Sequence, residues 1–173
     1  MGVFPGRLKY AKIKPDYKKE DKLLTTSYKS MSLWTSYSKI FNKLIYWSLY
    51  KHICTTNILV KVQYGFRSNS STEAAPCNVI NKIYKAMDKR LSVGGTVYDL
   101  KKAFDCVNHG ILVDKLEFYG ISGKFLTLTQ SYVRERYLKV LTDKINAYGS
   151  VTSRWKKVTN GVPQGSVSGP LLF

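Results

Sequence analysis

The chain has 173 residues, and 28 Lys and Arg against 11 Asp and Glu give it a formal net charge of +17. Such an excess of cations attracts polyanions, and the 13 Tyr offer faces on which bases can stack. Nucleic acid is therefore the favoured partner, over an anionic membrane surface or charge that serves solubility alone. The 44% hydrophobic content is enough for the core of one domain and excludes wholesale disorder.

Three cysteines, Cys54, Cys77 and Cys106, are an odd number and lack metal-ligand spacing. They predict neither a disulfide framework nor a zinc site, and a reducing, intracellular setting (nucleus or cytoplasm) is expected. No apolar run reaches the roughly 18 residues of a membrane span, and the N-terminus lacks the apolar core of a signal peptide. We expect neither secretion nor a membrane partner, and no pattern predicts an oligomeric state.

Two segments near the N-terminus predict different structures. Residues 4–22 alternate short apolar pieces with lysines, and Pro5 and Pro15 argue against a long helix there. Residues 37–53 carry apolar side chains at helical spacing and predict a core helix. The apolar positions of this helix are Tyr37, Ile40, Phe41, Leu44, Ile45, Leu49 and Ile53.

An extended piece at residues 58–62 leads into the segment Gln63-Tyr64-Gly65-Phe66-Arg67. A glycine between two aromatic residues lets the backbone approach a flat partner. The arginine beside them can bind a phosphate or pair with a carboxylate.

A second helix is predicted to end near Met87. Ser70 and Glu73 have the spacing of a capping box at its start. Pro76 would then fall inside the second turn, where a lost donor or a kink costs about 3 kcal/mol.

A short β-prone run, residues 96–98, is followed by Asp99 and by a predicted turn into a helix. A carboxylate at the end of a buried strand can hold Mg²⁺, which prefers oxygen ligands and takes one or two carboxylates plus substrate phosphates. The alternative for Asp99 alone is a solvated turn residue.

Helices and strands continue to the end of the chain. Asn108 or Asp105 can cap the helix that follows, and Gly120 suits its left-handed stop. The predicted segments are helices at residues 111–119 and 123–136, strands at residues 137–141 and 151–162 with a turn around residues 146–149, and a helix that begins at Gly169-Pro170.

The last of these segments follows the motif Gly161-Val162-Pro163-Gln164-Gly165-Ser166. Two glycines around a proline and a glutamine allow the backbone to come close to a base pair. The alternative is a tight turn without a ligand.

Together the two motifs closely resemble one family. The resemblance rests on Asp99-Leu100-x-x-Ala103-Phe104-Asp105-x-Val107-x-His109 and on Gly161-Val162-Pro163-Gln164-Gly165-Ser166-x-x-Gly169-Pro170, with Gln63-Tyr64-Gly65-Phe66-Arg67 and Ser71-Thr72 upstream. In this order, they look like a reverse transcriptase of the non-LTR retrotransposon type, LINE-like or jockey-like. The resemblance runs from about residue 4 to Phe173.

The resemblance implies an α+β fold, the right-hand polymerase. Residues 1–92 would be a basic, helical fingers region, and residues 93–173 would be a partial palm. The palm would contain an RNA-recognition-like sheet with flanking helices, and the fold would be incomplete.

The implied chemistry is RNA-templated DNA synthesis with two Mg²⁺ ions about 3.5–4 Å apart. By resemblance, Asp99 is the catalytic carboxylate and a metal ligand, and the backbone carbonyl of Leu100 completes the metal's shell. Asp105 would orient the turn rather than bind metal. His109 lacks a partner for base catalysis in the sequence, and we interpret it as structural.

The resemblance also implies contacts with an RNA template, a DNA primer and deoxynucleoside triphosphates. Lys29 and Arg67 would approach phosphates, and Lys29 stands where the family usually has arginine, so weaker nucleotide binding is expected. Phe104 would block a ribose 2′-hydroxyl, with a core phenylalanine as the alternative. Gln164 and Gly165 would touch the template, and Gln164 also the nucleotide.

The family's next motif, an aromatic residue followed by paired aspartates, would lie beyond Phe173. One carboxylate does not hold two Mg²⁺ ions, so this chain alone is expected to lack polymerase activity. The competing hypothesis is a non-catalytic basic nucleic-acid-binding module derived from a transposable element. A group II intron maturase is a third alternative and fits the two motifs less closely.

Overall fold

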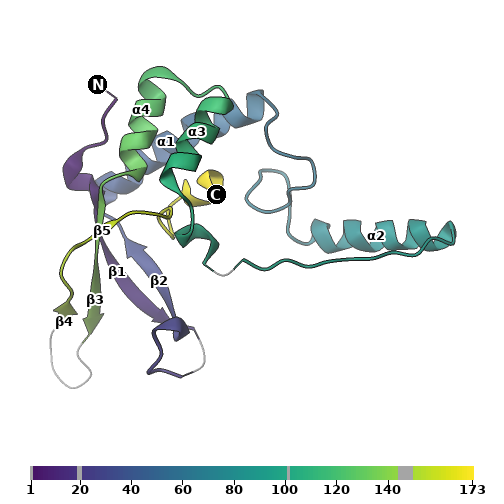
Figure 1. Cartoon of the computed structure of the whole chain (residues 1–173), viewed down its shortest axis with the longest axis horizontal. Helices are drawn as coiled ribbons and strands as arrows, with labels where there is room; N and C mark the ends of the chain where they lie inside the picture. Colours follow the sequence, from purple (N-terminus) through teal and green to yellow (C-terminus); the bar gives the residue numbers. More distant parts are fainter. Residues whose placement is uncertain (1, 19–20, 101, 144–149) are drawn as a thin grey trace. The chain divides into compact units, whose positions relative to one another are not determined.

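The computed structural model describes residues 2–18, 21–100, 102–143 and 150–173 (Figure 1). The chain forms two compact units, one of Met1–Tyr50 with Lys102–Phe173 and one of Lys51–Lys101. The predicted mixture of helices and strands is confirmed, and the sheet is mixed as well. The predicted division into a fingers region, residues 1–92, and a partial palm, residues 93–173, stays a prediction.

The first unit contains a five-stranded sheet. Strand β1 pairs with β2 in antiparallel and with β3 in parallel orientation, and β4 and β5 both pair with β3 in antiparallel orientation. The bounds are β1 (Tyr10–Tyr17), β2 (Tyr28–Leu33), β3 (Arg136–Asp143), β4 (Ser150–Thr152) and β5 (Lys156–Val158). The central part of the basic segment, residues 4–22, is thus strand β1, in which Pro15 lies opposite Ser30 of β2.

The two strands predicted after residue 136 are confirmed in part. The predicted second strand, residues 151–162, is interrupted between β4 and β5. Ser153 lies at the interruption, where its N–H donates to the Val140 carbonyl at 3.0 Å and its Oγ accepts from the Val140 N–H at 2.9 Å. A side-chain bond thus replaces one backbone bond and splits the strand. The predicted turn around residues 146–149 lies outside the described residues.

Helix α1 (Ser36–Thr55) confirms the predicted helix, but half of its predicted core face is wrong. Ile45, Leu49 and Ile53 are buried, and the four apolar positions before them, residues 37, 40, 41 and 44, are exposed. In this half of the helix a small polar residue is buried instead: Ser38 Oγ donates to the Leu8 carbonyl at 3.2 Å.

The other predicted helices of the first unit are confirmed, with small changes of bounds. They are α3 (His109–Phe118), α4 (Gly123–Val133) and the short α5 (Gly169–Leu172). Asn108 caps α3 by accepting from the N–H groups of Gly110 and Ile111, as predicted. Gly120 follows α3 with φ 85°, the left-handed conformation that was expected of it.

The core of the first unit lies where α1, α3 and α4 gather at one end of the sheet (Figure 1). Its buried members are Phe4, Ile45, Leu49, Leu112, Leu116, Ile121, Tyr132, Val133, Val162 and Leu172. The core therefore joins the N-terminal segment, three helices and the C-terminal motif in one apolar cluster.

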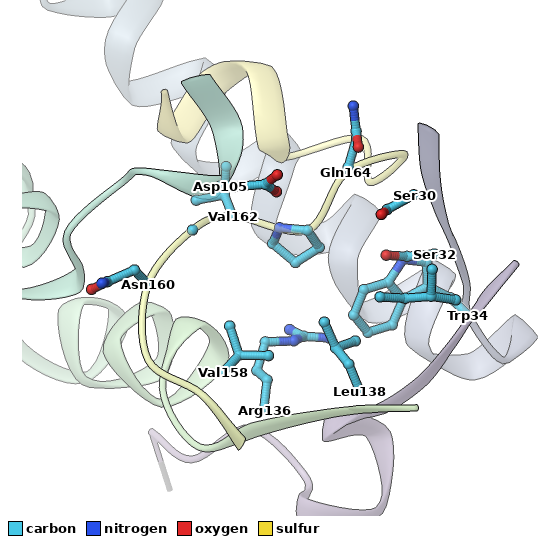
Figure 2. A pocket seen from close by; sticks show the side chains of 13 residues that line it. Ser30, Ser32, Trp34, Asp105, Arg136, Leu138, Val158, Asn160, Val162 and Gln164 are labelled. Atoms are coloured by element: carbon cyan, nitrogen blue, oxygen red, sulfur yellow. The ribbon is translucent and has the colours of Figure 1, made fainter. Parts of the chain in front are cut away.

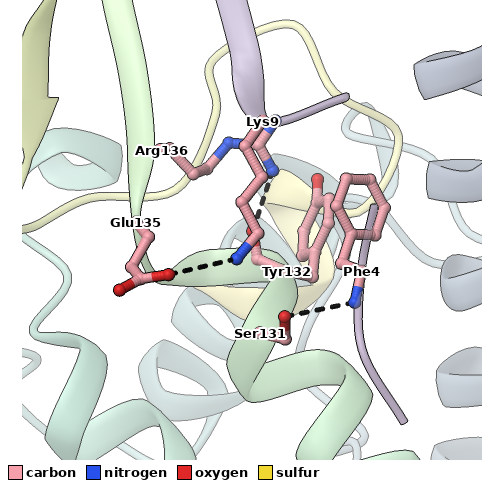
Figure 3. Close-up of polar contacts among 6 residues, drawn as sticks. All are labelled: Phe4, Lys9, Ser131, Tyr132, Glu135 and Arg136. Carbon is pink, nitrogen blue, oxygen red and sulfur yellow. Dashed lines mark hydrogen bonds and ion pairs between the residues drawn. The ribbon is translucent and has the colours of Figure 1, made fainter. Parts of the chain in front are cut away.

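A cation is built into the edge of this core (Figure 3). Arg136 is only 3% exposed. Its guanidinium carbon lies 4.1 Å from the ring centroid of Trp34, 4.7 Å from that of Tyr132 and 5.9 Å from that of Phe4. Its Nη1 donates to the Tyr132 carbonyl at 2.9 Å. Three aromatic faces thus replace part of the water that a buried guanidinium loses.

In the second unit, helix α2 (Ala74–Asp88) begins later than the capping box predicted. The Ala74 N–H donates to Ser71 Oγ at 3.2 Å, so Ser71 and not Ser70 meets the start of the helix. Pro76 is therefore the third residue of the helix. At this position an N–H group would have no acceptor within the helix, so the N–H that proline lacks is not missed. The predicted place of Pro76 in the second turn is therefore wrong, and no residue of α2 is buried.

The predicted strand at residues 96–98 is also wrong. Residues 91–100 contain neither helix nor strand, and every one of them is exposed, with Val97 at 96% and Tyr98 at 87%. A β-prone run becomes a strand only beside another strand that supplies hydrogen bonds. The described sheet is built from residues outside this run, and the assignment of residues 93–173 to a palm stays a prediction.

None of the helices within the described ranges is long and apolar enough to cross a membrane.

Candidate nucleic-acid site at the Gly161 loop

The loop that follows β5, residues 160–165, is hydrogen-bonded to the turn at residues 104–109. The Gly161 N–H donates to the Val107 carbonyl at 2.7 Å, and the Val162 N–H donates to the Phe104 carbonyl at 2.8 Å. Asn160 and Asn108 form an isolated β-bridge beside them. Two motifs that are more than fifty residues apart in the sequence are thus joined backbone to backbone.

His109 closes the same junction with its side chain. Its Nε2 lies 2.7 Å from the Gly161 carbonyl oxygen, and the residue is 7% exposed. Since a carbonyl only accepts, Nε2 carries the proton and donates it. This contact agrees with the interpretation of His109 as structural. The side chain fixes the start of the loop at Gly161.

Gly161 cannot be another residue without a change of backbone. Its φ is +90°, and an added Cβ would lie 2.9 Å from both the Cα and the carbonyl oxygen of Asp105 and 3.0 Å from the Phe104 oxygen. The glycine is therefore required twice, by its conformation and by the close approach of the two backbones.

The far end of the loop is closed by Ser166. Its Oγ donates to the Pro163 carbonyl at 2.7 Å and accepts from the Gly169 N–H at 2.9 Å. Beyond it, Tyr132 Oη lies 3.0 Å from Ser168 Oγ inside the core. Both ends of the Pro163-Gln164-Gly165 segment are thus fixed to the first unit.

A cavity of about 140 Å³ lies between this loop and one face of the sheet (Figure 2). Asp105 and Gln164 lie on one side of the cavity and Arg136, Leu138 and Val158 on the other (Figure 2). The other lining residues are Ile13, Ser30, Ser32, Trp34, Asn160, Gly161, Val162 and Pro163. The cavity therefore combines a carboxylate, an amide and a buried cation with apolar walls.

Burial lowers the pKa of Arg136 to about 10, and contact with Tyr132 opposes that fall. Arg136 therefore stays cationic at neutral pH. It keeps a positive charge at the wall of the cavity, opposite the exposed carboxylate of Asp105.

A family model described as reverse transcriptase (RNA-dependent DNA polymerase) matches residues 17–173. The chain belongs to the reverse transcriptase family.

Curated relatives come from non-LTR elements of flies, and they confirm the predicted jockey-like type. The chain is 32% identical over 147 residues to the probable RNA-directed DNA polymerase from transposon X-element of Drosophila melanogaster, which covers 85% of this chain and 15% of the relative. It is 32% identical over 174 residues to the RNA-directed DNA polymerase from mobile element jockey of the same species, covering 100% of this chain and 18% of the relative. The jockey polymerase of Drosophila funebris is 31% identical over 147 residues, covering 85% of this chain and 15% of the relative.

Three of the reverse transcriptase residues predicted from the sequence lie at or near the loop. Gln164 lines the cavity, and Gly165 is exposed with φ +84° and with nothing within 4 Å of an added Cβ. Phe104 is half-buried against the core, and its ring centroid lies 5.3 Å from that of Phe173. The core role of Phe104 is thus seen, and its role as sugar gate stays a prediction.

Lys29 is not brought to the cavity. In the register of β1 and β2, Lys29 lies opposite Asp16, whereas Ser30, its neighbour in β2, lines the cavity. Since successive strand residues point to opposite faces, Lys29 lies on the reverse face of the sheet.

Arg67, Asp99 and Leu100 belong to the second unit. Arg67 Nη1 donates to the Val60 carbonyl at 3.0 Å and so holds its own loop. Asp99 and Leu100 are exposed, and over the described ranges no three His, Cys, Asp or Glu side chains come together as a metal site. One exposed carboxylate alone does not make a Mg²⁺ site.

Arg136 is the site residue that sequence reasoning missed. It is the first residue of β3 and ends the charged run Arg134-Glu135-Arg136, where an arginine is expected to be solvated. The one signal was alternation, because Arg136, Leu138 and Val140 occupy the same face of β3. That signal becomes readable only after the bounds of the strand are known.

Proposed function

We propose that this chain is a part of an RNA-directed DNA polymerase that copies the RNA of a non-LTR retrotransposon. The observation that carries the proposal is the junction of the Gly161 loop with the turn at residues 104–109, because it joins the two motifs that define the resemblance. The chain spans 15% to 18% of the length of the curated relatives it matches. Template, primer and nucleotides are therefore proposed as partners of the longer protein.

In this proposal, Asp99 is the chain's catalytic carboxylate, and together with the carbonyl of Leu100 it would hold Mg²⁺ once further ligands complete the site. Hard cations prefer such oxygen ligands, and phosphoryl transfer uses two of them to stabilise the attacking and leaving oxygens. The exposed position of Asp99 leaves its carboxylate open to partners. By the family resemblance, the further carboxylates would be a pair of aspartates in the longer protein.

The remaining roles concern the nucleotide and the template. Gln164 and Gly165 would meet the template at the mouth of the cavity, and Gln164 also the nucleotide. Lys29 and Arg67 would bind phosphates, and Phe104 would exclude a ribose 2′-hydroxyl. A lysine at position 29 keeps the positive charge but lacks the planar fork of arginine, so single rather than paired hydrogen bonds to phosphate are expected there.

A primer-extension assay tests what the chain does alone. With an RNA template, a DNA primer, deoxynucleotides and Mg²⁺, we expect no extension, since one carboxylate does not hold two metal ions. The Asp99→Asn variant is the control. Extension that needs Mg²⁺ and disappears in Asp99→Asn would show that the chain is a complete catalyst and overturn the proposal of an inactive part.

Binding separates the polymerase proposal from a non-catalytic nucleic-acid module. The high positive charge supports both, because it attracts any polyanion. Retained polymerase geometry predicts tighter binding to a primer–template junction than to a blunt RNA–DNA duplex of equal length, and Gln164→Ala should reduce that preference. Equal binding of both ligands, with a steep loss on adding salt, would favour the module.

A further inference from the structure

The face of the sheet that does not line the cavity carries a distinct set of side chains. Residues paired across neighbouring strands point to the same face, so the register of the strands defines this set. Tyr10 pairs with Tyr137, Lys12 with Lys139 and with Leu33, Lys14 with Met31, Asp16 with Lys29, and Tyr137 with Lys157. We call these residues, together with Trp155 beside them, the Tyr10 face.

Aromatic rings form the centre of the Tyr10 face. Tyr10 and Tyr137 are stacked, with centroids 5.1 Å apart and planes 12° from parallel. Trp155 meets Tyr10 edge to face at 5.0 Å, and Lys139 Nζ lies 4.9 Å from the Trp155 ring centroid. Tyr10 is 43% exposed and Trp155 44%, so the rings keep open surface on which a further ring can stack.

Lysines continue along the same face from the rings. Lys12, Lys14 and Lys29 follow from β1 and β2, and Lys139 and Lys157 from β3 and β5. Lys12 is exposed and lies across from the half-buried Lys139. Phosphates spaced along a strand of nucleic acid complement such a row of cations.

We infer that the Tyr10 face binds single-stranded nucleic acid, with bases stacked on Tyr10 and Trp155 and phosphates on Lys12, Lys139 and Lys157. Bases in a duplex are already stacked and paired, whereas unpaired bases can lie on aromatic side chains of a sheet. This surface is the reverse of the one that lines the cavity, because Ser30 and Ser32 alternate with the residues of the face. The inference therefore goes beyond the proposed contacts of Gln164.

The first test removes the exposed ring and keeps a matched tryptophan. The ligand is a fluorescein-labelled oligouridylate, and the readout is fluorescence anisotropy. Trp155→Ala should weaken binding about tenfold, the effect of losing one stacked base. Trp47→Ala is the control, since Trp47 is 56% exposed on α1 and away from the sheet, and it should leave the Kd unchanged.

The second test removes charge, and it stays informative if Trp155→Ala disturbs the loop between β4 and β5. The triple variant Lys12→Gln, Lys139→Gln and Lys157→Gln should reduce the slope of log K against log salt by about 2, since each phosphate contact of a single strand contributes about 0.7. Circular dichroism verifies that each variant is folded.

The matched control for charge is the triple variant Lys39→Gln, Lys43→Gln and Lys115→Gln. These lysines are exposed on α1 and α3 of the same unit, and their removal changes the net charge by the same amount. Equal salt slopes in the two triple variants would overturn the inference, because charge alone would then explain binding. An unchanged Kd in Trp155→Ala would overturn the role of stacking.

Duplex competitors complete the design. An unlabelled oligouridylate should displace the probe much better than a duplex RNA of the same length, and equal competition would contradict a single-strand surface. Gln164→Ala should leave oligouridylate binding intact. If the chain shows no preference for the primer–template junction but Trp155→Ala still weakens oligouridylate binding, the proposed function is refuted and the Tyr10 face stands. If the junction preference is present but Trp155→Ala has no effect, the Tyr10 face alone is refuted.

Discussion

The Gly161 loop and the segment around Asp99 are equally clear as sequence motifs, and they differ completely in structure. In the loop, the N–H groups of Gly161 and Val162 and the Gly161 carbonyl all have hydrogen-bond partners in the same unit. Residues 91–100 have no regular structure, and all of them are exposed. The strength of a motif in the sequence therefore says nothing about whether its local fold is formed.

The difference has a physical cause. The loop meets its partners within its own unit, since the turn at residues 104–109, α3 and α4 all belong to it. The run at residues 96–98 has only its intrinsic β propensity, and propensity is worth little without a neighbouring strand. If this account is right, substitutions at the loop should cost much stability and substitutions at Asp99 little.

The largest effect is expected for Gly161→Ala. A left-handed alanine and a forced contact with the Asp105 backbone should together lower the free energy of unfolding by about 4 kcal/mol. Gly165→Ala is the matched control, because its φ is +84° with nothing within 4 Å of the added Cβ. It should cost about 1–2 kcal/mol, from the backbone conformation alone. Urea denaturation measures both, and equal losses would contradict the close approach at Gly161.

Arg136→Ala is expected to come next, with a loss of about 3 kcal/mol from the cavity it leaves and from the unpaired Tyr132 carbonyl. Arg136→Met keeps apolar contact with the rings of Phe4, Trp34 and Tyr132 and should lose about half as much. Thermal or urea unfolding distinguishes the two variants. A methionine as harmful as an alanine would mean that the charge, and not the packing, stabilises this edge of the core.

His109→Ala should lower stability by about 2 kcal/mol, because it leaves the buried Gly161 carbonyl without its donor. His109→Gln offers a donor at similar reach and should recover part of the loss. Hydrogen exchange of the Gly161 and Val162 amides gives a local readout, and we expect faster exchange in His109→Ala. Unchanged exchange at these two amides would show that His109 does not hold the loop.

Local patterns predicted much of this fold. Helical spacing gave α1, α3 and α4, Asn108 and Gly120 marked the ends of α3, and the start of α5 followed from Gly169-Pro170. These signals depend on neighbours in the sequence, which is why they could be read without the structure.

Contacts between distant segments could not be predicted in this way. The parallel pairing of β1 with β3 joins residues more than 120 positions apart, and the burial of Ser38 depends on the backbone at Leu8. For the site, the motif predicted that the loop glycines and Gln164 approach nucleic acid, which stays a prediction, and the structure shows Gly161 close to the Asp105 backbone instead. The place of Arg136 in the cavity wall was not predicted, because it depends on three rings from different parts of the chain.

The smallest effect is expected for Asp99→Asn. Asp99 is exposed, and its neighbours Val97 and Tyr98 are almost fully exposed, so the change should alter the free energy of unfolding by less than about 0.5 kcal/mol. Asp114→Asn, an exposed carboxylate in α3, is the matched control for loss of one negative charge. A loss above 1 kcal/mol in Asp99→Asn alone would mean that the carboxylate already has a structural partner, and it would remove the contrast between the two motifs. A loss within the range of the control would leave Asp99 as a residue whose place in the sequence reflects chemistry rather than folding.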